Sequence, residues 1–301
     1  MTRRDRGLLL LLTPVIWGVT FPAGKRALET LPLLPFTAWS RIYGLAALAL
    51  SLPLLLRWAP WRAPLRRLVL PGAVLGGIMF VAFTLQSAGL ERTTATNAGF
   101  LTGLYVVFTP LLGLALFRRR VGVWAWVAVG LSILGLGLLS MRDLGSLDPS
   151  SGDLLVLAGA VAWAGHLTAV GYFAERHPAL PLSVAQLTGA AAFHLVAAIP
   201  GGVDLAGAGE VWHLLVITGV LGSGVAFTIQ VIGQGSVSAT RAAIILAGES
   251  VVAAFASAIW LGERLQAHQW AGAAVAVSAM VLSEIGARRK PATRLDPATA
   301  V

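Results

Sequence analysis

Arg41, His166 and Glu249 are ionisable side chains deep inside otherwise apolar stretches of this 301-residue chain. A charge near the centre of a bilayer-spanning helix costs about 2.5–3.5 kcal/mol, so each of these residues needs a compensating role. Glu249 lies near the middle of its stretch, where a carboxylate can carry a proton or bind a substrate ammonium group. We therefore expect Glu249 to bind substrate and Arg41 to be structural or gating. The alternative is a purely structural ion pair between Arg41 and Glu249.

His166 follows Trp163 by one helical turn, so the two side chains share a face. Imidazole titrates near neutral pH, which suits contact with a substrate or a proton relay. A neutral, hydrogen-bonded histidine packed in the core is the alternative. Another histidine, His194, is expected near the outer end of its helix, at the membrane interface.

Four aromatic side chains are predicted at mid-depth: Trp17, Tyr43, Tyr105 and Trp163. Tryptophan and tyrosine usually mark the two membrane interfaces, so deep positions require a different explanation. Core packing is one. The other is the wall of a central cavity, where Trp17 and Trp163 would face each other and all four would contact substrate.

Two glutamines and two prolines complete the candidate set. Gln86 and Gln230 are expected toward opposite ends of a pore, as interhelical hydrogen-bonding groups or as gates. Pro22 and Pro110 lie inside helical stretches, where proline removes a backbone hydrogen bond and bends the helix. They are interpreted either as static kinks or as hinges.

The elements that must position these residues are ten apolar stretches, each long enough to cross a hydrocarbon core about 30 Å thick. Apolar residue types make up 57% of the chain and charged types 12%, and the mean hydropathy is +0.80. This composition excludes an ordinary soluble globule. The predicted helices span residues 8–27, 34–56, 68–89, 95–117, 121–140, 154–174, 179–200, 213–234, 239–261 and 266–286.

The net charge of +9 is carried by short loops and tails beside the helices, so it indicates topology and not nucleic-acid binding. Of the 22 Lys and Arg residues, sixteen fall on the side that holds both termini, five on the opposite side, and Arg41 inside a helix. Positive charge collects on the cytoplasmic side of membrane proteins. Both termini are therefore predicted to be cytoplasmic.

The ten stretches form two sets of five that overlay without gaps. A shift of 146 residues relates Trp17 to Trp163, and a shift of 144 relates FTLQ at 83–86 to FTIQ at 227–230. Because five is odd, consecutive five-helix units cross the membrane in opposite senses, and inverted repeats are typical of alternating-access transporters. The predicted organisation is a first repeat at 8–140, a linker at 141–153, a second repeat at 154–286 and a disordered cytoplasmic tail at 287–301.

Several segments in this order resemble the EamA family of the drug/metabolite transporter superfamily. They are VIWGVTF at 15–21, the arginine of WSRIYG at 39–44, TTATNAGFLTGLYVVFTPLLGLALFRRR at 93–120, SATRAAIILAGESVVAAFASAIWLGERL at 238–265 and QWAGAAV at 269–275. The resemblance implies an all-α polytopic membrane protein of ten helices in two inverted EamA repeats. It also implies export of amino acids, aromatic ones included, of related metabolites or of amphipathic drugs from the cytoplasm.

Two departures from the family pattern are visible. The first repeat ends in FRRR at 117–120, where the family commonly carries Gly-Glu-Arg. Ser250 follows Glu249 where similar sequences often carry proline, which weakens the case for a helix break at that point.

Several chemistries find no support in the sequence. It contains no Walker loop, no HExxH motif and no metal-ligand spacing among its five histidines, and it has no cysteine. We therefore expect no enzyme activity, no cofactor and no metal site. An uncoupled channel or scramblase is the alternative to a secondary exporter. The expected partners are a small-molecule substrate and membrane lipids, with nucleic acid rejected and a monomer as the working assumption. Arginine, alanine and glycine are abundant and lysine is rare, a composition that suggests a GC-rich bacterial source. The expected location is therefore the bacterial inner membrane.

Overall fold

The computed structural model describes residues 3–58, 61–118, 121–140 and 150–288. Residues 141–149 of the predicted linker and 289–301 of the predicted tail lie outside the described residues, and the last three linker residues, 151–153, already belong to a helix. Within those residues every regular element is helical and none is a strand, which confirms the all-α class.

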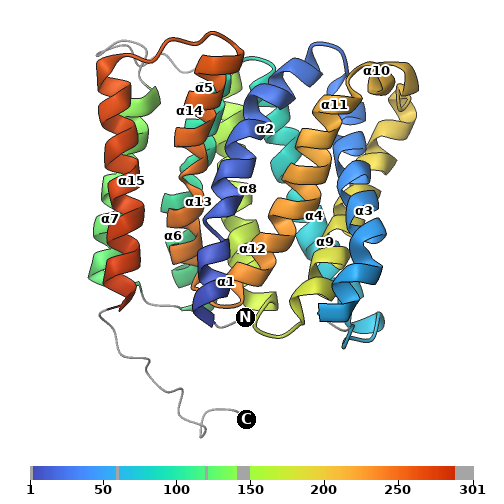
Figure 1. The fold of residues 1–301 in the computed structure, drawn as a ribbon, viewed down its shortest axis with the longest axis horizontal. Helices are drawn as coiled ribbons and strands as arrows, with labels where there is room; N and C mark the ends of the chain where they lie inside the picture. Colours follow the sequence, from blue (N-terminus) through green and yellow to red (C-terminus); the bar gives the residue numbers. More distant parts are fainter. Residues whose placement is uncertain (1–2, 59–60, 119–120, 141–149, 289–301) are drawn as a thin grey trace, which may run out of the picture.

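The first half of the chain folds into seven helices (Figure 1). They are α1 (Arg3–Leu9), α2 (Leu12–Leu28), α3 (Leu33–Trp58), α4 (Arg66–Leu90), α5 (Ala95–Gly103), α6 (Tyr105–Phe117) and α7 (Val123–Ser140). The second half repeats this pattern with additional short segments. These elements are α8 (Ser151–Phe173), α9 (Ala179–Ala198), η1 (Ile199–Gly201), α10 (Leu205–Glu210), α11 (Trp212–Leu215), the π-helical η2 (Val216–Val225), α12 (Ala226–Gln234), α13 (Ala239–Leu246), α14 (Glu249–Trp260) and α15 (Ala267–Arg288).

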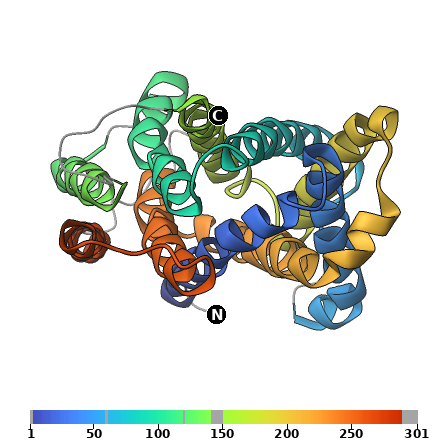
Figure 2. The same ribbon diagram turned by 90° about the horizontal axis from the view of Figure 1, so that it is seen from above.

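Eight helical stretches of the described chain are long and apolar enough to cross a membrane. Two further apolar helices are shorter, Val123–Leu138 within α7 and Ala267–Leu282 within α15. These two helices pack against each other along one side of the bundle, as Figures 1 and 2 show. All ten predicted stretches therefore contain helix, and eight of them are both long and apolar enough to cross a membrane by the described residues alone.

Two of the long stretches are broken at corresponding points. The first contains α5 and α6, which meet at Leu104, and the second contains α13 and α14, which are separated by Ala247 and Gly248. Leu104 and Gly248 are 144 residues apart, the offset that relates the two halves. The break before Glu249 thus forms without a proline at position 250, and a glycine, which is a poor helix former, lies at its centre.

The same two stretches also begin alike. The Thr94 side chain accepts a hydrogen bond from the backbone N–H of Asn97 at 3.1 Å, and the Ser238 side chain accepts one from Arg241 at 3.3 Å. These side chains satisfy N–H groups that a helix start leaves without partners. Thr94 and Ser238 are again 144 residues apart, so local sequence sets both starts in the same way.

Helices of one half pack mainly against helices of the other. α2 runs along α14. The helix of the second half that corresponds to α2 is α8, and it runs along α5 and α6. Likewise α3 packs against η2, and α9 packs against α4. Small residues permit the close approach that membrane helices need. A Cβ atom placed on Gly76 of α4, for example, would lie 2.5 Å from the backbone of Gly189 in α9.

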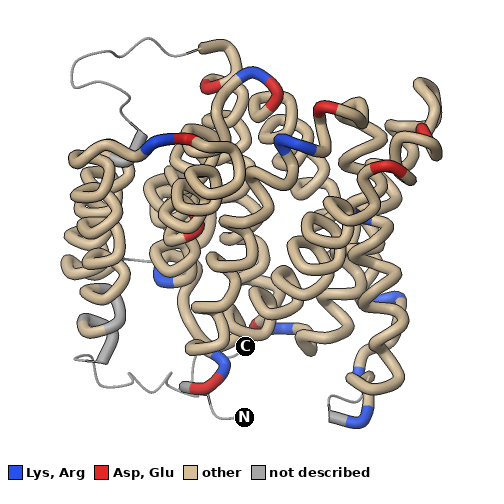
Figure 3. The backbone as a smooth tube through the Cα atoms, turned by 45° about the horizontal axis from the view of Figure 1, so that its top comes forward, with Lys and Arg blue, Asp and Glu red and all other residues tan. Residues whose placement is uncertain are grey.

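Charged residues gather mainly near the two ends of the bundle, and few lie between them (Figure 3). The first helix, α1, and the last turn of α15 lie at the same end (Figure 1). An uncharged middle between two charged ends is what a bilayer requires of a bundle that crosses it.

Candidate functional site: a central pocket where the two halves meet

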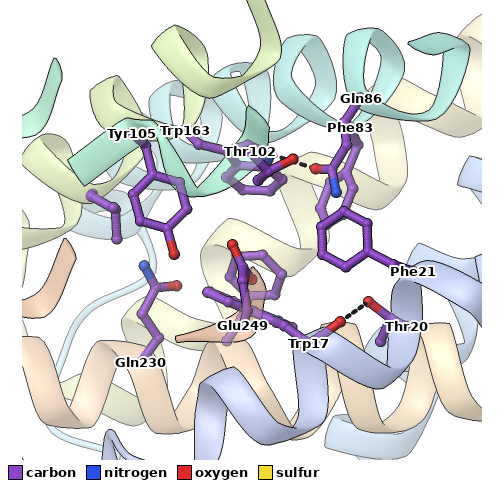
Figure 4. A pocket seen from close by; sticks show the side chains of 12 residues that line it. Trp17, Thr20, Phe21, Phe83, Gln86, Thr102, Tyr105, Trp163, Gln230 and Glu249 are labelled. Atoms are coloured by element: carbon purple, nitrogen blue, oxygen red, sulfur yellow. Dashed lines mark hydrogen bonds between the residues drawn. The ribbon is translucent and has the colours of Figure 1, made fainter. Parts of the chain in front are cut away.

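A pocket lined by twelve residues lies inside the bundle (Figure 4). Ten of its twelve lining residues form five pairs that the 144- or 146-residue offset relates. The pairs are Trp17 and Trp163, Phe21 and Leu167, Phe83 and Phe227, Gln86 and Gln230, and Tyr105 and Glu249, with Thr20 and Thr102 as the remaining two lining residues. The pocket is therefore built by equivalent positions of the two halves.

Aromatic rings form most of the wall. The ring centroids of Trp17 and Phe227 are 4.8 Å apart, those of Phe83 and Trp163 are 4.6 Å apart, and those of Trp163 and Phe227 are 5.7 Å apart. Such a wall offers apolar contact to a ligand and cation-π attraction to an ammonium group.

Hydrogen bonds hold both tryptophan rings in place. Trp17 Nε1 donates to the Gly222 carbonyl oxygen in η2 at 2.9 Å, and Trp163 Nε1 donates to Gln86 Oε1 at 2.5 Å. Each bond links one half of the chain to the other. A buried indole N–H that is already paired leaves the ring face free for a ligand.

Three polar side chains converge on one side of the pocket: Tyr105, Gln230 and Glu249 (Figure 4). Glu249 is the first residue of α14 and is 3% exposed, and its Oε1 has no hydrogen-bond partner. The Tyr105 hydroxyl is close enough to interact electrostatically with this carboxylate, but it makes no complete hydrogen bond. Gln230 Nε2 donates to Gln234 at 2.8 Å, whereas Gln230 Oε1 has no partner. These groups retain hydrogen-bonding capacity that a ligand can use.

Arg41 lies in an adjoining pocket and not beside Glu249. Its guanidinium carbon is 3.5 Å from the Phe83 ring centroid, and the residue is 3% exposed. Among the described residues no ion pair joins Arg41 to Glu249, so the structure does not contain the predicted structural pair. The adjoining pocket shares Trp17, Phe83 and Gln86 with the central one.

This second pocket extends the cavity on one side of its centre. It continues past Gly24, Phe36 and Ser87, whose counterparts in the other half are Val170, Leu182 and Val231. The counterparts are 0% exposed and pack together with Leu75 in a closed apolar cluster. One side of the centre is hollow, and the equivalent side is filled.

The other predicted site residues lie outside both pockets. The His166 ring stands behind the pocket wall, 5.6 Å from the Trp163 and Phe227 rings, with Nε2 3.1 Å from Gln186 Oε1. Tyr43 packs instead against Trp39, with ring centroids 6.5 Å apart. Pro22 and Pro110 are buried inside α2 and α6, and both helices continue through them.

One expectation about depth requires correction. Gln86 and Gln230 do not lie toward opposite ends of a pore, because both line the central pocket. His194, expected near the membrane interface, is 0% exposed, and its ring packs 4.9 Å from Phe80 and 6.2 Å from Phe83, so the bundle encloses it. The position of a residue along its helix predicts its depth in the membrane. Whether the side chain is buried depends on which neighbouring helix covers it, and the sequence does not show this.

Phe21, Phe83 and Phe227 are lining residues that were not singled out from the sequence. A signal for two of them was present, because Phe83 and Phe227 begin the repeated segments FTLQ and FTIQ. Within the described ranges no group of three or more His, Cys, Asp or Glu residues could hold a metal ion.

Comparison with known proteins agrees with this architecture. Residues 6–141 and 150–284 each match the EamA-like transporter family. An uncharacterized transporter of Archaeoglobus fulgidus is 30% identical over 91% of this chain and 83% of its own length. A probable amino-acid metabolite efflux pump of Salmonella typhimurium is 25% identical over 98% of this chain and 100% of its own.

Two further similarities concern a named substrate and the fold. The threonine/homoserine exporter RhtA of Salmonella typhimurium is 26% identical over 82% of this chain and 83% of its own length. A protein of known crystal structure superposes with a TM-score of 0.77 and 19% identity, over 97% of this chain and 100% of the other. That structure shares the fold.

Proposed function

Because the chain belongs to the EamA-like transporter family, we propose that it is a secondary transporter that exports small metabolites, amino acids above all, from the cytoplasm by alternating access. The relatives named as exporters act on amino-acid metabolites or on threonine and homoserine. Aromatic amino acids are included in the proposal, because the central pocket has an aromatic wall.

The observation that carries the proposal is the one-sided cavity. Pseudo-equivalent residues line its centre, but only one of the two equivalent routes from that centre is hollow. In a protein of inverted repeats, exchanging the conformations of the two halves would fill the hollow route and open the filled one. This geometry supports alternating access over an open channel, which needs a continuous path.

We further propose ten membrane spans, with α7 and α15 added to the eight long apolar stretches, and two inverted repeats at 8–140 and 154–286. The even number of crossings agrees with α1 and the end of α15 lying at one end of the bundle. The positive-inside rule assigns this end to the cytoplasm. The bacterial relatives support the inner membrane as the location.

The proposed site residues are those of the central pocket. Trp17 and Trp163 contact the substrate with their ring faces, and Tyr105 and Glu249 bind its polar group. Tyr43 and His166 keep a supporting role, because the first packs away from the pocket and the second buttresses its wall. Gln86 is a positioning residue for the Trp163 ring.

Counterflow in liposomes tests this proposal. Purified protein is reconstituted, the vesicles are loaded with one unlabelled amino acid, and uptake of a trace of the labelled compound is followed. A carrier gives transient accumulation above equilibrium that saturates with concentration, whereas a channel gives simple equilibration. Protein-free vesicles are the control. Equilibration without overshoot for every amino acid tested would reject the carrier.

A further inference from the structure

The two acidic or basic side chains that are buried within the described residues, apart from histidines, lie in adjoining pockets. Glu249 lines the central pocket, and Arg41 lines the one that extends from it. Trp17, Phe83 and Gln86 belong to both linings, so a single ligand can contact the shared wall while it extends toward each charge.

Among the described residues neither charge has an oppositely charged side chain paired with it. Glu249 Oε1 and the Nε and Nη1 atoms of Arg41 are buried without hydrogen-bond partners. Burying an ion costs several kcal/mol unless an opposite charge and hydrogen bonds replace its hydration. A protein that keeps two opposite charges apart in connected cavities therefore has two complementary binding points for a ligand.

The surroundings of Arg41 favour an anion. The Phe83 ring covers one face of the guanidinium at 3.5 Å, which leaves the edge that carries the N–H groups available. The His194 ring of α9 is close enough to Arg41 to interact with its charge. Histidine is a base, and α9 contains no acidic residue, so this helix offers Arg41 no negative charge. An edge-on guanidinium is suited to bidentate binding of a carboxylate.

Both charges also break the symmetry of the site. The residue equivalent to Glu249 is Tyr105, and the residue equivalent to Arg41 is Leu187. Without these two residues the pocket would be a nearly symmetric apolar and amide-lined cavity. The two charges therefore give the pocket a positive and a negative pole.

We propose that the cavity selects zwitterions, with the substrate ammonium group at Glu249 and the substrate carboxylate at Arg41. The apolar part of the molecule lies against Trp17, Phe83 and Phe227. The assignment rests on the proposed amino-acid export and extends it, because it names Arg41 as the group that recognises the carboxylate. Compounds that carry only one of the two charges lose one binding point.

Three related ligands test the assignment on detergent-purified protein. The twenty standard amino acids are first compared by thermal shift, since a ligand of the folded state raises the melting temperature. For the amino acid with the largest shift, dissociation constants are then measured for the free compound, its N-acetyl derivative and its methyl ester. The wild type should bind both derivatives more weakly by roughly ten-fold or more, because a site built for a polar group rejects an analogue that lacks it.

Two variants separate the poles. Glu249→Gln should bind the N-acetyl derivative as well as the free amino acid, while it still discriminates against the ester. Arg41→Gln should show the reverse preference. Matched controls are Glu29→Gln and Arg176→Gln, whose side chains are about half exposed at the surface, at 55% and 46%. Both controls should keep the wild-type preferences.

Selectivity distinguishes binding from a structural role. If either pocket variant weakened all three ligands by the same factor, or if the wild type bound the ester as tightly as the free amino acid, the assignment would be wrong. Should Arg41→Gln fail to fold, Arg41→Lys retains the positive charge and must still prefer the free carboxylate over the ester. A failure of all twenty amino acids to bind would also overturn it.

The result is separable from the transport proposal. Counterflow by a protein that does not discriminate against the N-acetyl derivative and the methyl ester would reject the zwitterion site and leave the exporter in place. The expected discrimination without counterflow would support the zwitterion site and reject export.

Discussion

Tyr105 and Glu249 occupy the same position in the two halves of the chain and face the same pocket. Each is the first residue after a helix break, Tyr105 in α6 and Glu249 in α14. They stand 144 residues apart, as do Phe83 and Phe227. The hydroxyl and the carboxylate interact across the pocket without closing a hydrogen bond. A duplicated framework thus holds a neutral polar group on one side and an acid on the other.

The first prediction concerns this acid. Glu249→Gln should fold normally and melt at the wild-type temperature or above, because it removes a buried charge that has no ion-pair partner among the described residues. Counterflow should fall by about ten-fold or more, since the ammonium group of the substrate loses its charged partner. Tyr105→Phe is the matched change at the equivalent position and should have the smaller effect.

The pH profile separates the remaining possibilities. If the ionised carboxylate binds an ammonium group or exchanges a proton, wild-type transport should decline as acid protonates it, and the Gln variant should lack this decline. A well-folded Glu249→Gln protein with unchanged transport and unchanged pH dependence would reduce Glu249 to a packing residue.

The second prediction concerns the aromatic wall. Trp17→Ala and Trp163→Ala should each lower transport by roughly ten-fold, because each removes apolar contact and a cation-π surface. Trp17→Phe loses the hydrogen bond to Gly222. Because it retains an aromatic ring, its transport should fall less than that of Trp17→Ala. Trp212→Ala, at a side chain 58% exposed, is the control for loss of a tryptophan. Normal transport in both pocket variants would show that these rings only pack.

The parts of the site that follow from sequence are those that the repeat determines. Trp17 and Trp163 correspond at one offset and Phe83 and Phe227 at the other, so their convergence is what the proposed inverted duplication predicts. Which helices surround the site does not follow, because it depends on how each helix is rotated against neighbours distant in sequence.

Arg41 illustrates this limit. Its depth in the bilayer as predicted from the sequence is close to that of Glu249, which made an ion pair plausible. The rotation of α3 places its guanidinium on the Phe83 ring of α4 instead. Periodicity and helix length report depth, and they carry no information about this rotation.

The third prediction is topological and uses the absence of cysteine from the natural chain. Glu91→Cys and Asp204→Cys lie in connections assigned to the outside, and Arg176→Cys lies in one assigned to the cytoplasm. A membrane-impermeant maleimide should label the first two in intact spheroplasts. It should label Arg176→Cys only after the membrane is permeabilised. The inverse pattern would overturn the assigned orientation and, with it, the direction of export.

The fourth prediction tests the one-sided cavity through an equivalent pair. Ser87 lines the hollow route, and Val231, 144 residues later, is 0% exposed in the filled one. In detergent-purified protein without substrate, a small thiol reagent should modify Ser87→Cys faster than Val231→Cys. Substrate should change the two rates in opposite directions if the halves exchange conformations. Equal rates that substrate does not change would contradict alternating access between these routes.

The last prediction concerns stability at the contact between the halves. Gly76→Ala in α4 should destabilise the protein by about 1–3 kcal/mol, the usual cost of overpacking. Its new Cβ would meet the backbone of Gly189 and Ala190 in α9 at 2.5 Å, and backbone atoms cannot move aside as a flexible side chain can. Gly165→Ala in α8 is the control, because a Cβ there meets no atom within 4 Å. Thermal unfolding in detergent should therefore separate two identical substitutions in long helices, with a lower melting temperature only for Gly76→Ala. Equal melting temperatures would mean that α4 and α9 can move apart at no cost, and their contact would then not fix the distance between the two halves.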